Sequence, residues 1–210
     1  MDFAYKHRHK HKLYLNVTNR CTNRCSFCVR YRTEGLGGAV LWGKEEPDLG
    51  QLKAAVEEQG SLHDFSEFIW CGYGEPTFRL ELIVEAASWL RSGGGIIRLN
   101  TNGHACLIHG RDVFAELSSA VDEVSVSLNA PNRRRYLQLC SPDIASFTYP
   151  GGGAPALEDF WDSMIDFLFR SPAYFKKTQA SVVGFVLTEE EISQCELLAR
   201  SLGIKHFRVR

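Results

Sequence analysis

Cys21-Thr22-Asn23-Arg24-Cys25-Ser26-Phe27-Cys28 is the stretch that decides the fold and the chemistry of this chain. Its three cysteines stand at C-x3-C-x2-C spacing, just after the apolar run Leu13-Tyr14-Leu15-Asn16-Val17. Thiolates are soft ligands that suit iron–sulfur clusters, zinc and copper(I). A closed site for zinc or for a cluster needs four protein ligands, and the local set stops at three. A cubane [4Fe–4S] cluster held by three thiolates keeps one iron open to a small molecule.

The cysteine stretch resembles the signature of the radical S-adenosylmethionine (SAM) superfamily, in which an aromatic residue precedes the third cysteine. With its flanks, residues 15–20 and 29–30, it most resembles a subgroup associated with TatD-type nucleases. The resemblance implies that Cys21, Cys25 and Cys28 hold a [4Fe–4S] cluster whose open iron binds SAM. On the cysteine triplet alone, a structural zinc knuckle with a distant fourth ligand stays open as the alternative.

Length and composition are those of a single globular α/β domain. The chain has 210 residues, of which 44% are apolar and 23% charged, and its net charge of −1 gives no overall attraction to nucleic acid or to a membrane. Residues 1–12 are rich in Lys and His and predict a solvated basic arm, which leaves residues 13–210 as one core domain. The seven cysteines are odd in number and mostly scattered, so we expect a reducing, cytoplasmic setting.

An alternation of strand and helix signals predicts a parallel sheet with helical crossovers. Strands are expected at residues 13–17, 65–71, 96–100, 123–128, 179–187 and 205–209. Helices are expected at residues 48–59, 79–91, 112–119, 156–169 and 189–201, with a Gly/Pro-rich loop at 142–155. Periodicity does not separate a doubly wound sheet from a curved one. The family resemblance implies a partial (β/α)6 barrel of the TIM type, covering the chain from about Leu13 onward.

Functional residues of parallel α/β folds lie in the loops after the strands, and two such loops carry the first predictions. Phe27 lies between two of the cysteines, where the family places an aromatic ring against adenine. Gly74 and Glu75 resemble the last two residues of the family's Gly-Gly-Glu motif, with Tyr73 in place of the first glycine. Glycine lets backbone approach a ligand closely, and a carboxylate offsets the ammonium charge of SAM.

The next two strand ends complete the predicted SAM pocket. Thr101 and Asn102 resemble pocket-lining residues of the family, although Asn-Gly alone is only a turn signal. Ser127 and Asn129 point to one side of their strand and resemble the positions that bind the ribose, against the alternative of a half-exposed strand. An apolar contact with adenine is expected from residues 183–186. No catalytic residue is assigned.

The resemblance implies reductive cleavage of SAM to a 5′-deoxyadenosyl radical that abstracts hydrogen from an unidentified substrate, with reduced flavodoxin or ferredoxin as electron donor. Glycyl-radical activases and carboxydeazaguanine synthases are reaction types open within the family. An iron–sulfur electron carrier without SAM, or a zinc scaffold, is the alternative of a different class. Six strands leave a barrel open, so a protein or an anionic partner is expected to cover it, and nucleic acid stays open. Arg30, Arg32 and Arg133-Arg134-Arg135 either hold an anionic substrate or are solvated.

Overall fold

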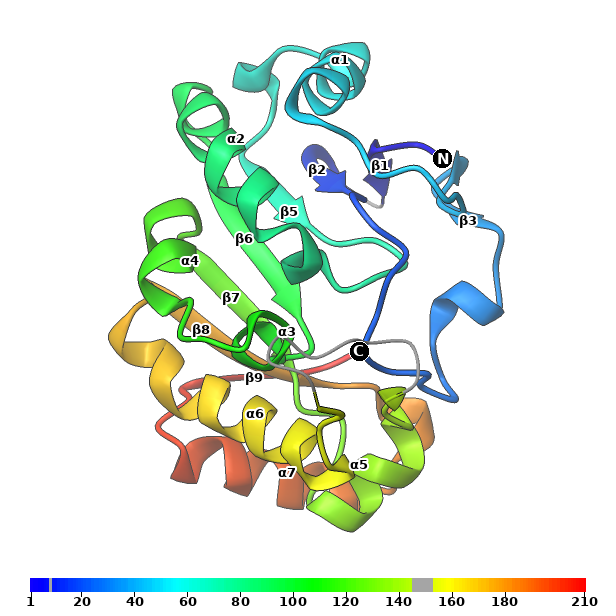
Figure 1. The fold of residues 1–210 in the computed structure, drawn as a ribbon, viewed down its shortest axis with the longest axis vertical. Coiled ribbons are helices and arrows are strands. Elements are labelled where there is room, and N and C mark those ends of the chain that lie inside the picture. Colours follow the sequence, from blue (N-terminus) through cyan, green and yellow to red (C-terminus); the bar gives the residue numbers. More distant parts are fainter. Residues whose placement is uncertain (8, 145–152) are drawn as a thin grey trace.

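The computed structural model describes residues 1–7, 9–144 and 153–210, arranged around one seven-stranded sheet (Figure 1). Its strand order is β1-β2-β5-β6-β7-β8-β9. These strands are β1 (Ala4–His7), β2 (His9–Leu15), β5 (Glu67–Trp70), β6 (Ile96–Thr101), β7 (Glu123–Ser127), β8 (Lys177–Val182) and β9 (His206–Val209). The short strands β3 (Gly35–Leu36) and β4 (Ala39–Val40) form a separate hairpin.

Every neighbouring pair from β2 to β9 is parallel, which confirms the predicted parallel sheet. The helices are α1 (Leu49–Gln59), α2 (Leu80–Ser92), α3 (Ala105–His109), α4 (Phe114–Ala120), α5 (Arg133–Cys140), α6 (Leu157–Arg170) and α7 (Glu189–Ser201). The side chains of Asp48 and Thr188 cap α1 and α7. Asp48 accepts a hydrogen bond from the Gln51 N–H, and Thr188 accepts one from the Glu191 N–H. Among the described residues, none of these helices is long and apolar enough to cross a membrane.

The N-terminal residues differ from the expected solvated arm. β1 pairs antiparallel with β2, and its Ala4 and Tyr5 are each 3% exposed. The Tyr5 ring stacks on Tyr14 with ring centroids 5.3 Å apart. The many Lys and His residues of this segment hid a strand pair, because the charged side chains lie on its exposed positions. The sheet edge is therefore β1, not the strand over residues 13–17.

Three further differences lie near strand ends. The fifth predicted strand stops at Val182, and residues Gly184–Val186 form a 3-10 helix, η6. The helices α3 and α5 were not among the expected helices. The α5 helix begins at Arg133, and Asn132 caps it by accepting a hydrogen bond from the Arg135 N–H. The predicted loop at 142–155 lies largely outside the described residues.

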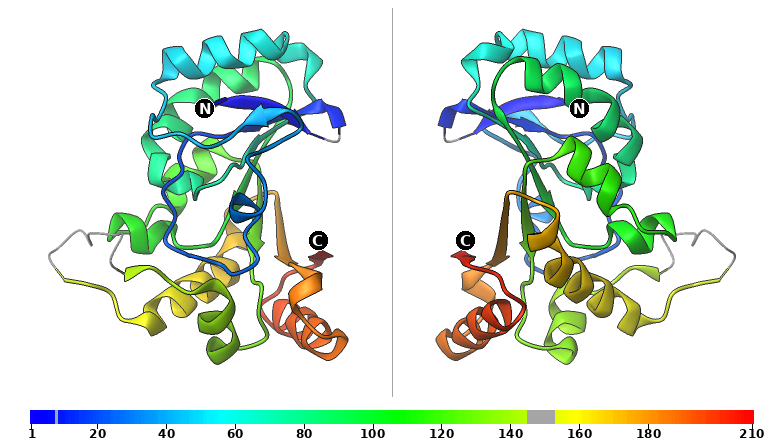
Figure 2. Two further views of the ribbon diagram at one scale, coloured as in Figure 1. Left: turned by 90° about the vertical axis from the view of Figure 1, so that its right-hand side faces the viewer. Right: turned by 90° about the vertical axis from the view of Figure 1, so that its left-hand side faces the viewer.

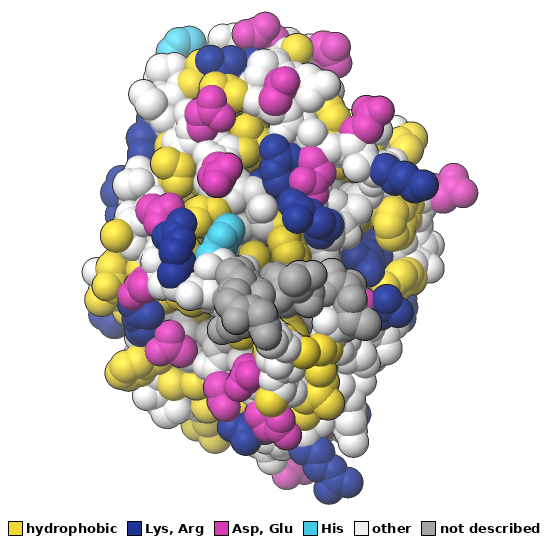
Figure 3. All heavy atoms as spheres, viewed as in Figure 1, with side chains coloured by type: hydrophobic (Ala, Val, Ile, Leu, Met, Phe, Trp, Pro, Cys, Tyr) yellow, Lys and Arg dark blue, Asp and Glu magenta, His cyan; other side chains and the backbone are white. Residues whose placement is uncertain are grey.

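The two faces of the sheet are chemically different. Side chains of one face pack into the main apolar core with the helices, which lie along the outside of the curved sheet in Figure 2. These are Leu13, Leu15, Phe68, Trp70, Ile97, Leu99, Val124, Val126, Ala180 and Val182. The alternating residues of the opposite, inner face are mostly polar. The molecular surface seen in Figure 3 carries interspersed basic and acidic side chains, as the small net charge requires.

Candidate functional site

A cavity of about 420 Å³ opens where the parallel strands end. Loops after β2, β5, β6 and β7 contribute to its wall, as expected for a parallel α/β fold. All predicted site residues line this one cavity: Cys21, Cys25, Cys28, Phe27, Gly74, Glu75, Thr101, Asn102, Ser127 and Asn129. A larger groove of about 640 Å³, lined partly by α1 and α2, contains none of them. The predicted site residues therefore share the smaller cavity, whose volume suits a small-molecule ligand.

The three thiols of the cysteine stretch are free and face the cavity. Burial raises the pKa of Cys21 to about 12 and also raises the pKa of Cys28. A hydrogen bond with the Cys140 thiol, together with burial, raises the pKa of Cys25. Cys140, one of the four cysteines outside the triplet, therefore lies against a predicted ligand. In the protein alone these groups are neutral thiols, and bound iron would be needed to draw off their protons. Among the described residues, no group of three or more His, Cys, Asp or Glu is arranged to hold a single metal ion.

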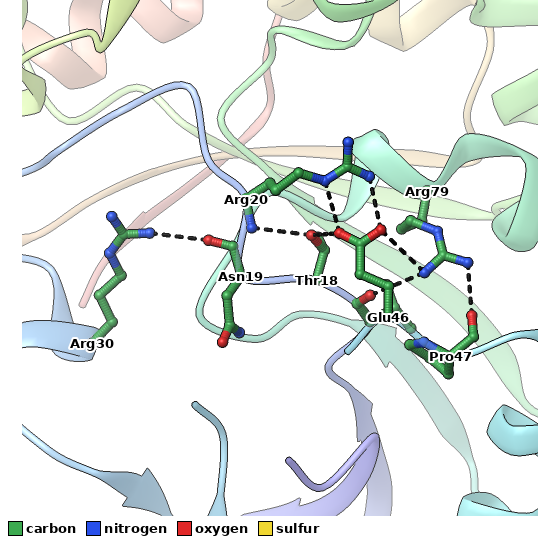
Figure 4. A network of polar contacts seen from close by, with 8 residues as sticks. Thr18, Asn19, Arg20, Arg30, Glu46, Pro47 and Arg79 are labelled. Atoms are coloured by element: carbon green, nitrogen blue, oxygen red, sulfur yellow. Dashed lines mark hydrogen bonds and ion pairs between the residues drawn. The ribbon is translucent and has the colours of Figure 1, made fainter. Parts of the chain in front are cut away.

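A polar network holds the start of the cysteine loop from outside (Figure 4). Glu46 accepts a bidentate pair of hydrogen bonds from Arg20, at 2.7 and 2.8 Å, and a third from the Thr18 hydroxyl at 2.5 Å. Arg79 lies 3.5 Å from the same carboxylate and donates to the Pro47 carbonyl at 2.7 Å. The Arg20–Glu46 pair lowers the pKa of Glu46 against the opposing effect of burial. Segments on both sides of the loop are thus fixed to one carboxylate.

A second, buried network supports the loop from inside. The Asn102 amide donates to the Thr22 hydroxyl at 2.8 Å, and that hydroxyl lies 2.7 Å from Nδ1 of His104. The other ring nitrogen of His104 lies 3.0 Å from the Tyr136 hydroxyl, which accepts from the Asn23 amide at 3.1 Å. Burial lowers the pKa of His104 to about 3, so the ring is neutral. The residues beside Cys21 are therefore anchored on α3 and α5 as well as on the sheet.

Glu75 is the buried carboxylate of the site, with 3% of its surface exposed. Its Oε1 accepts from the Thr77 N–H at 3.2 Å and from the hydroxyls of Thr77 and Thr101, each at 2.8 Å. Its Oε2 accepts from the Asn102 N–H at 2.7 Å. Burial raises the pKa of Glu75, while these four hydrogen bonds favour the charged form. No Lys, Arg or His among the described residues forms an ion pair with Glu75. A buried carboxylate without a cation fits a positively charged ligand such as the SAM ammonium group.

Packing within the protein, and not only the approach of a ligand, requires glycine at position 74. A Cβ atom added there would lie 2.4 Å from the carbonyl oxygen of Thr18 and 2.6 Å from that of Arg20. The Glu75 N–H donates to the same Arg20 oxygen at 2.8 Å. The glycine of this motif therefore allows the turn after β5 to pack directly on the cysteine loop. The expected reason, close approach of SAM, is not the only one.

Three asparagines of the cavity wall, Asn23, Asn100 and Asn129, have an Oδ1 atom without a hydrogen-bond partner among the described residues. These Oδ1 atoms are buried, and Asn129 as a whole is 5% exposed. Asn129 also adopts a φ of 56°, in the left-handed region that is uncommon for a residue other than glycine. Such buried, unpaired acceptors fit a ligand that carries hydroxyl donors, as the ribose of SAM does. Asn100 was not predicted, although the alternation of β6 places it on the inner face.

The arginines left open by the sequence separate into two groups. Arg133 pairs with Asp162 on α6 at 2.6 Å, and Arg135 pairs with Glu191 on α7 at 2.8 Å, so both join helices. Arg30 lies 4.8 Å from the centroid of the adjacent Tyr31 ring, and Arg32 lies 4.7 Å from the centroid of the Phe185 ring. The Arg32 contact joins the cysteine loop to η6. Residues 183–186, from which an adenine contact is expected, contain the 3-10 turn η6, and Val183 and Phe185 line the cavity.

Comparisons with known proteins identify the family to which the chain belongs. The family model of the radical SAM superfamily matches residues 15–148, more than half of the chain. The chain belongs to the radical SAM superfamily. The match runs from the end of β2 through the cysteine loop to beyond α5, so it includes every predicted site residue. No curated protein matches the sequence.

Several solved structures share the fold of this chain. Streptococcus suis SuiB bound to the precursor peptide SuiA matches with a TM-score of 0.64 at 16% identity, over 95% of this chain and 38% of that one. SuiB bound to S-adenosylmethionine gives 0.58 at 15% identity, over 93% and 37%. HydG, a maturase of the [FeFe]-hydrogenase, gives 0.53 at 12% identity, over 91% and 37%. This chain thus spans less than half the length of these proteins. The predicted partial barrel of the radical SAM domain is confirmed.

Proposed function

We propose that this protein is a radical SAM enzyme whose cluster and SAM occupy the cavity at the strand ends. The observation that carries the proposal is the buried carboxylate of Glu75, which has no ion-pair partner among the described residues and shares one cavity with three free thiols. Cys21, Cys25 and Cys28 would hold a [4Fe–4S] cluster. Once reduced, such a cluster would supply one electron for the cleavage of SAM to methionine and a 5′-deoxyadenosyl radical, the species that would remove a hydrogen atom from the substrate.

The protein's own part is to bind, orient and shield. Glu75 would accept a hydrogen bond from the ammonium group of SAM at Oε2, which accepts from the Asn102 N–H alone, whereas Oε1 already accepts from three donors. Asn129 and Ser127 would meet the ribose hydroxyls, and Phe27 would pack against adenine. Thr101 and Asn102 would act as positioning residues, because each donates a hydrogen bond to the Glu75 carboxylate.

The electron donor, the compartment and the domain organisation are proposed from sequence resemblance and composition. Reduced flavodoxin or ferredoxin would supply the electron, the compartment would be the reducing cytoplasm, and the chain would form one core domain with β1 added to its edge. The flanks of the cysteine stretch favour the subgroup associated with TatD-type nucleases. The reaction on the final substrate is not assigned, and activase and synthase chemistry both stay open.

Metal content and SAM affinity test the proposal against its alternatives. The protein would be reconstituted anaerobically, its iron and zinc counted, and SAM binding measured by calorimetry. We expect about four irons per chain, no zinc, and one SAM. A cluster without SAM binding would instead indicate an electron carrier, and one zinc per chain would indicate a scaffold.

A further inference from the structure

The inner face of the sheet is a polar surface that leads away from the proposed SAM site. In a closed barrel the strand side chains that point inward fill the interior, mainly with branched apolar residues. Here the inward positions of β6 to β9 are mostly polar or charged: Arg98, Asn100, Glu123, Ser125, Ser127, Lys177, Gln179, Ser181, His206 and Arg208. A wall of this kind suits a hydrated chamber that holds a polar molecule.

Most charges on this inner face are paired. Arg98 lies 2.8 Å from Glu67, which also pairs with Lys12 at 2.6 Å. Lys177 lies 3.8 Å from Glu123, its neighbour in the register of β7 and β8. The positive and negative charges of these residues on the inner face therefore nearly cancel.

Two arginines at the end of β9 are the exception. Arg208 lies opposite Ser181 in the register of β8 and β9, and the period of two places Arg210 on the same side. Neither arginine forms an ion pair with an Asp or Glu among the described residues. Arg210 lines the cavity and donates a hydrogen bond to the Ser127 hydroxyl at 3.1 Å. Desolvation and the neighbouring charges of Arg208 and Arg98 lower the pKa of Arg210 against the opposing effect of Cys71, although the residue as a whole is exposed to solvent.

We propose that Arg210 and Arg208 form an anion site for the carboxylate or phosphate group of the substrate. The proposal rests on the proposed function, because Ser127 is one of the residues expected to contact SAM. An anion held at Arg210 lies in the same cavity as the thiols and Glu75. The guanidinium fork matches either anion bidentately, since both present paired oxygens.

The backbone around this pair is well fixed. The Arg210 N–H donates to the Val182 carbonyl at 2.9 Å, and the Gly184 N–H donates to the Arg210 carbonyl at 2.9 Å. These bonds extend the pairing of β9 with β8 beyond the strand and into η6. Arg210 is therefore held in register with the cavity wall.

Anion binding to the reconstituted, SAM-loaded protein tests the proposal. Inorganic phosphate and acetate would be titrated separately at constant ionic strength and followed by calorimetry, and the anion that binds more tightly identifies the source. Arg210→Gln and Arg208→Gln would be compared with Arg200→Gln, whose arginine pairs with Glu196 on the outer helix α7. We expect Arg210→Gln to weaken binding of the preferred anion by about tenfold to a hundredfold, the loss typical of a charge-assisted hydrogen bond.

The expected pattern also has Arg210→Lys intermediate, Arg208→Gln weaker than wild type, and Arg200→Gln unchanged, all with unaltered SAM affinity. Equal anion affinity in wild type and Arg210→Gln would overturn the proposal, as would the absence of saturable binding of either anion. Loss of SAM affinity alone in Arg210→Gln would mean that the arginine holds SAM, which also overturns it. A wild-type protein that binds SAM but neither anion rejects this inference and leaves the proposed function standing.

Discussion

Replacing Glu75 by alanine should destabilise the protein as well as weaken SAM binding. The carboxylate accepts from two backbone N–H groups, of Thr77 and Asn102, and from two threonine hydroxyls. The hydroxyls can rotate to other acceptors, but the two N–H groups cannot. Each buried donor left without a partner costs about 1–3 kcal/mol, so Glu75→Ala should lower the free energy of unfolding by about 2–6 kcal/mol.

Glu75→Gln separates the loss of charge from the loss of packing. The glutamine oxygen can replace Oε1, while its amide nitrogen faces the Asn102 N–H and leaves only that donor unpaired. We expect about 1–3 kcal/mol of destabilisation for Glu75→Gln, clearly less than for Glu75→Ala. Both variants should bind SAM about tenfold to a hundredfold more weakly, because each removes the charge that the ammonium group would meet.

The assay pairs chemical denaturation with SAM calorimetry on the same reconstituted samples. Glu85→Ala on the exposed side of α2 is the matched control and should change neither quantity. An unfolding free energy for Glu75→Ala within about 0.5 kcal/mol of wild type would refute the reasoning about buried donors. Unchanged SAM affinity in a folded Glu75→Gln protein would refute the role given to the carboxylate.

The remaining predictions concern the cysteine loop and its supports. Replacing any one of Cys21, Cys25 and Cys28 by alanine should abolish the absorbance of the cluster, whereas Cys140→Ala and Cys195→Ala should retain it. Loss of the cluster in Cys140→Ala would instead indicate a closed site with four thiolates. Gly74→Ala should lower the iron content although it removes no ligand, because the added methyl meets loop backbone at 2.4 Å; full iron content would show that the loop can yield. His104 is neutral in the fold down to about pH 3, so acidification from pH 7 to pH 5 protonates it only in the unfolded chain. Stability should therefore fall by about 2 kcal/mol more in wild type than in His104→Gln over that range, and parallel losses in the two proteins would contradict the buried neutral ring.

Local signals in the sequence were enough for the parallel sheet, and the family resemblance supplied the residues of the cavity wall. Each predicted site residue lies within or just after a strand, and parallel strands end at one edge, so prediction of the strands also placed these residues together. The N-terminal strand pair was missed because Lys and His dominate its composition, although Ala4 and Tyr5 are buried. Composition averages over both faces of a strand, and only the pairing shows which face is covered.

The supports of the site were less accessible to sequence analysis. His104 lies 82 residues from Thr22 in the sequence, and Tyr136 lies 113 residues from Asn23. The helices near these two supporting residues are short. No spacing rule links such positions, because the contact exists only once α3 and α5 pack beside the loop. Arg210 likewise became a candidate only when the register of β9 placed it beside Ser127. Partners of buried groups depend on tertiary packing and cannot be derived from periodicity.

The measurement that tests the central claim most directly is the release of 5′-deoxyadenosine from SAM by the reconstituted protein under dithionite. We predict release that requires reductant, cluster and SAM together, that is lost in Cys28→Ala, and that persists in Cys195→Ala. Equal release from the Cys28→Ala protein, or none from a wild-type protein shown to hold about four irons and to bind SAM, would contradict the assignment of this cavity as a radical SAM site.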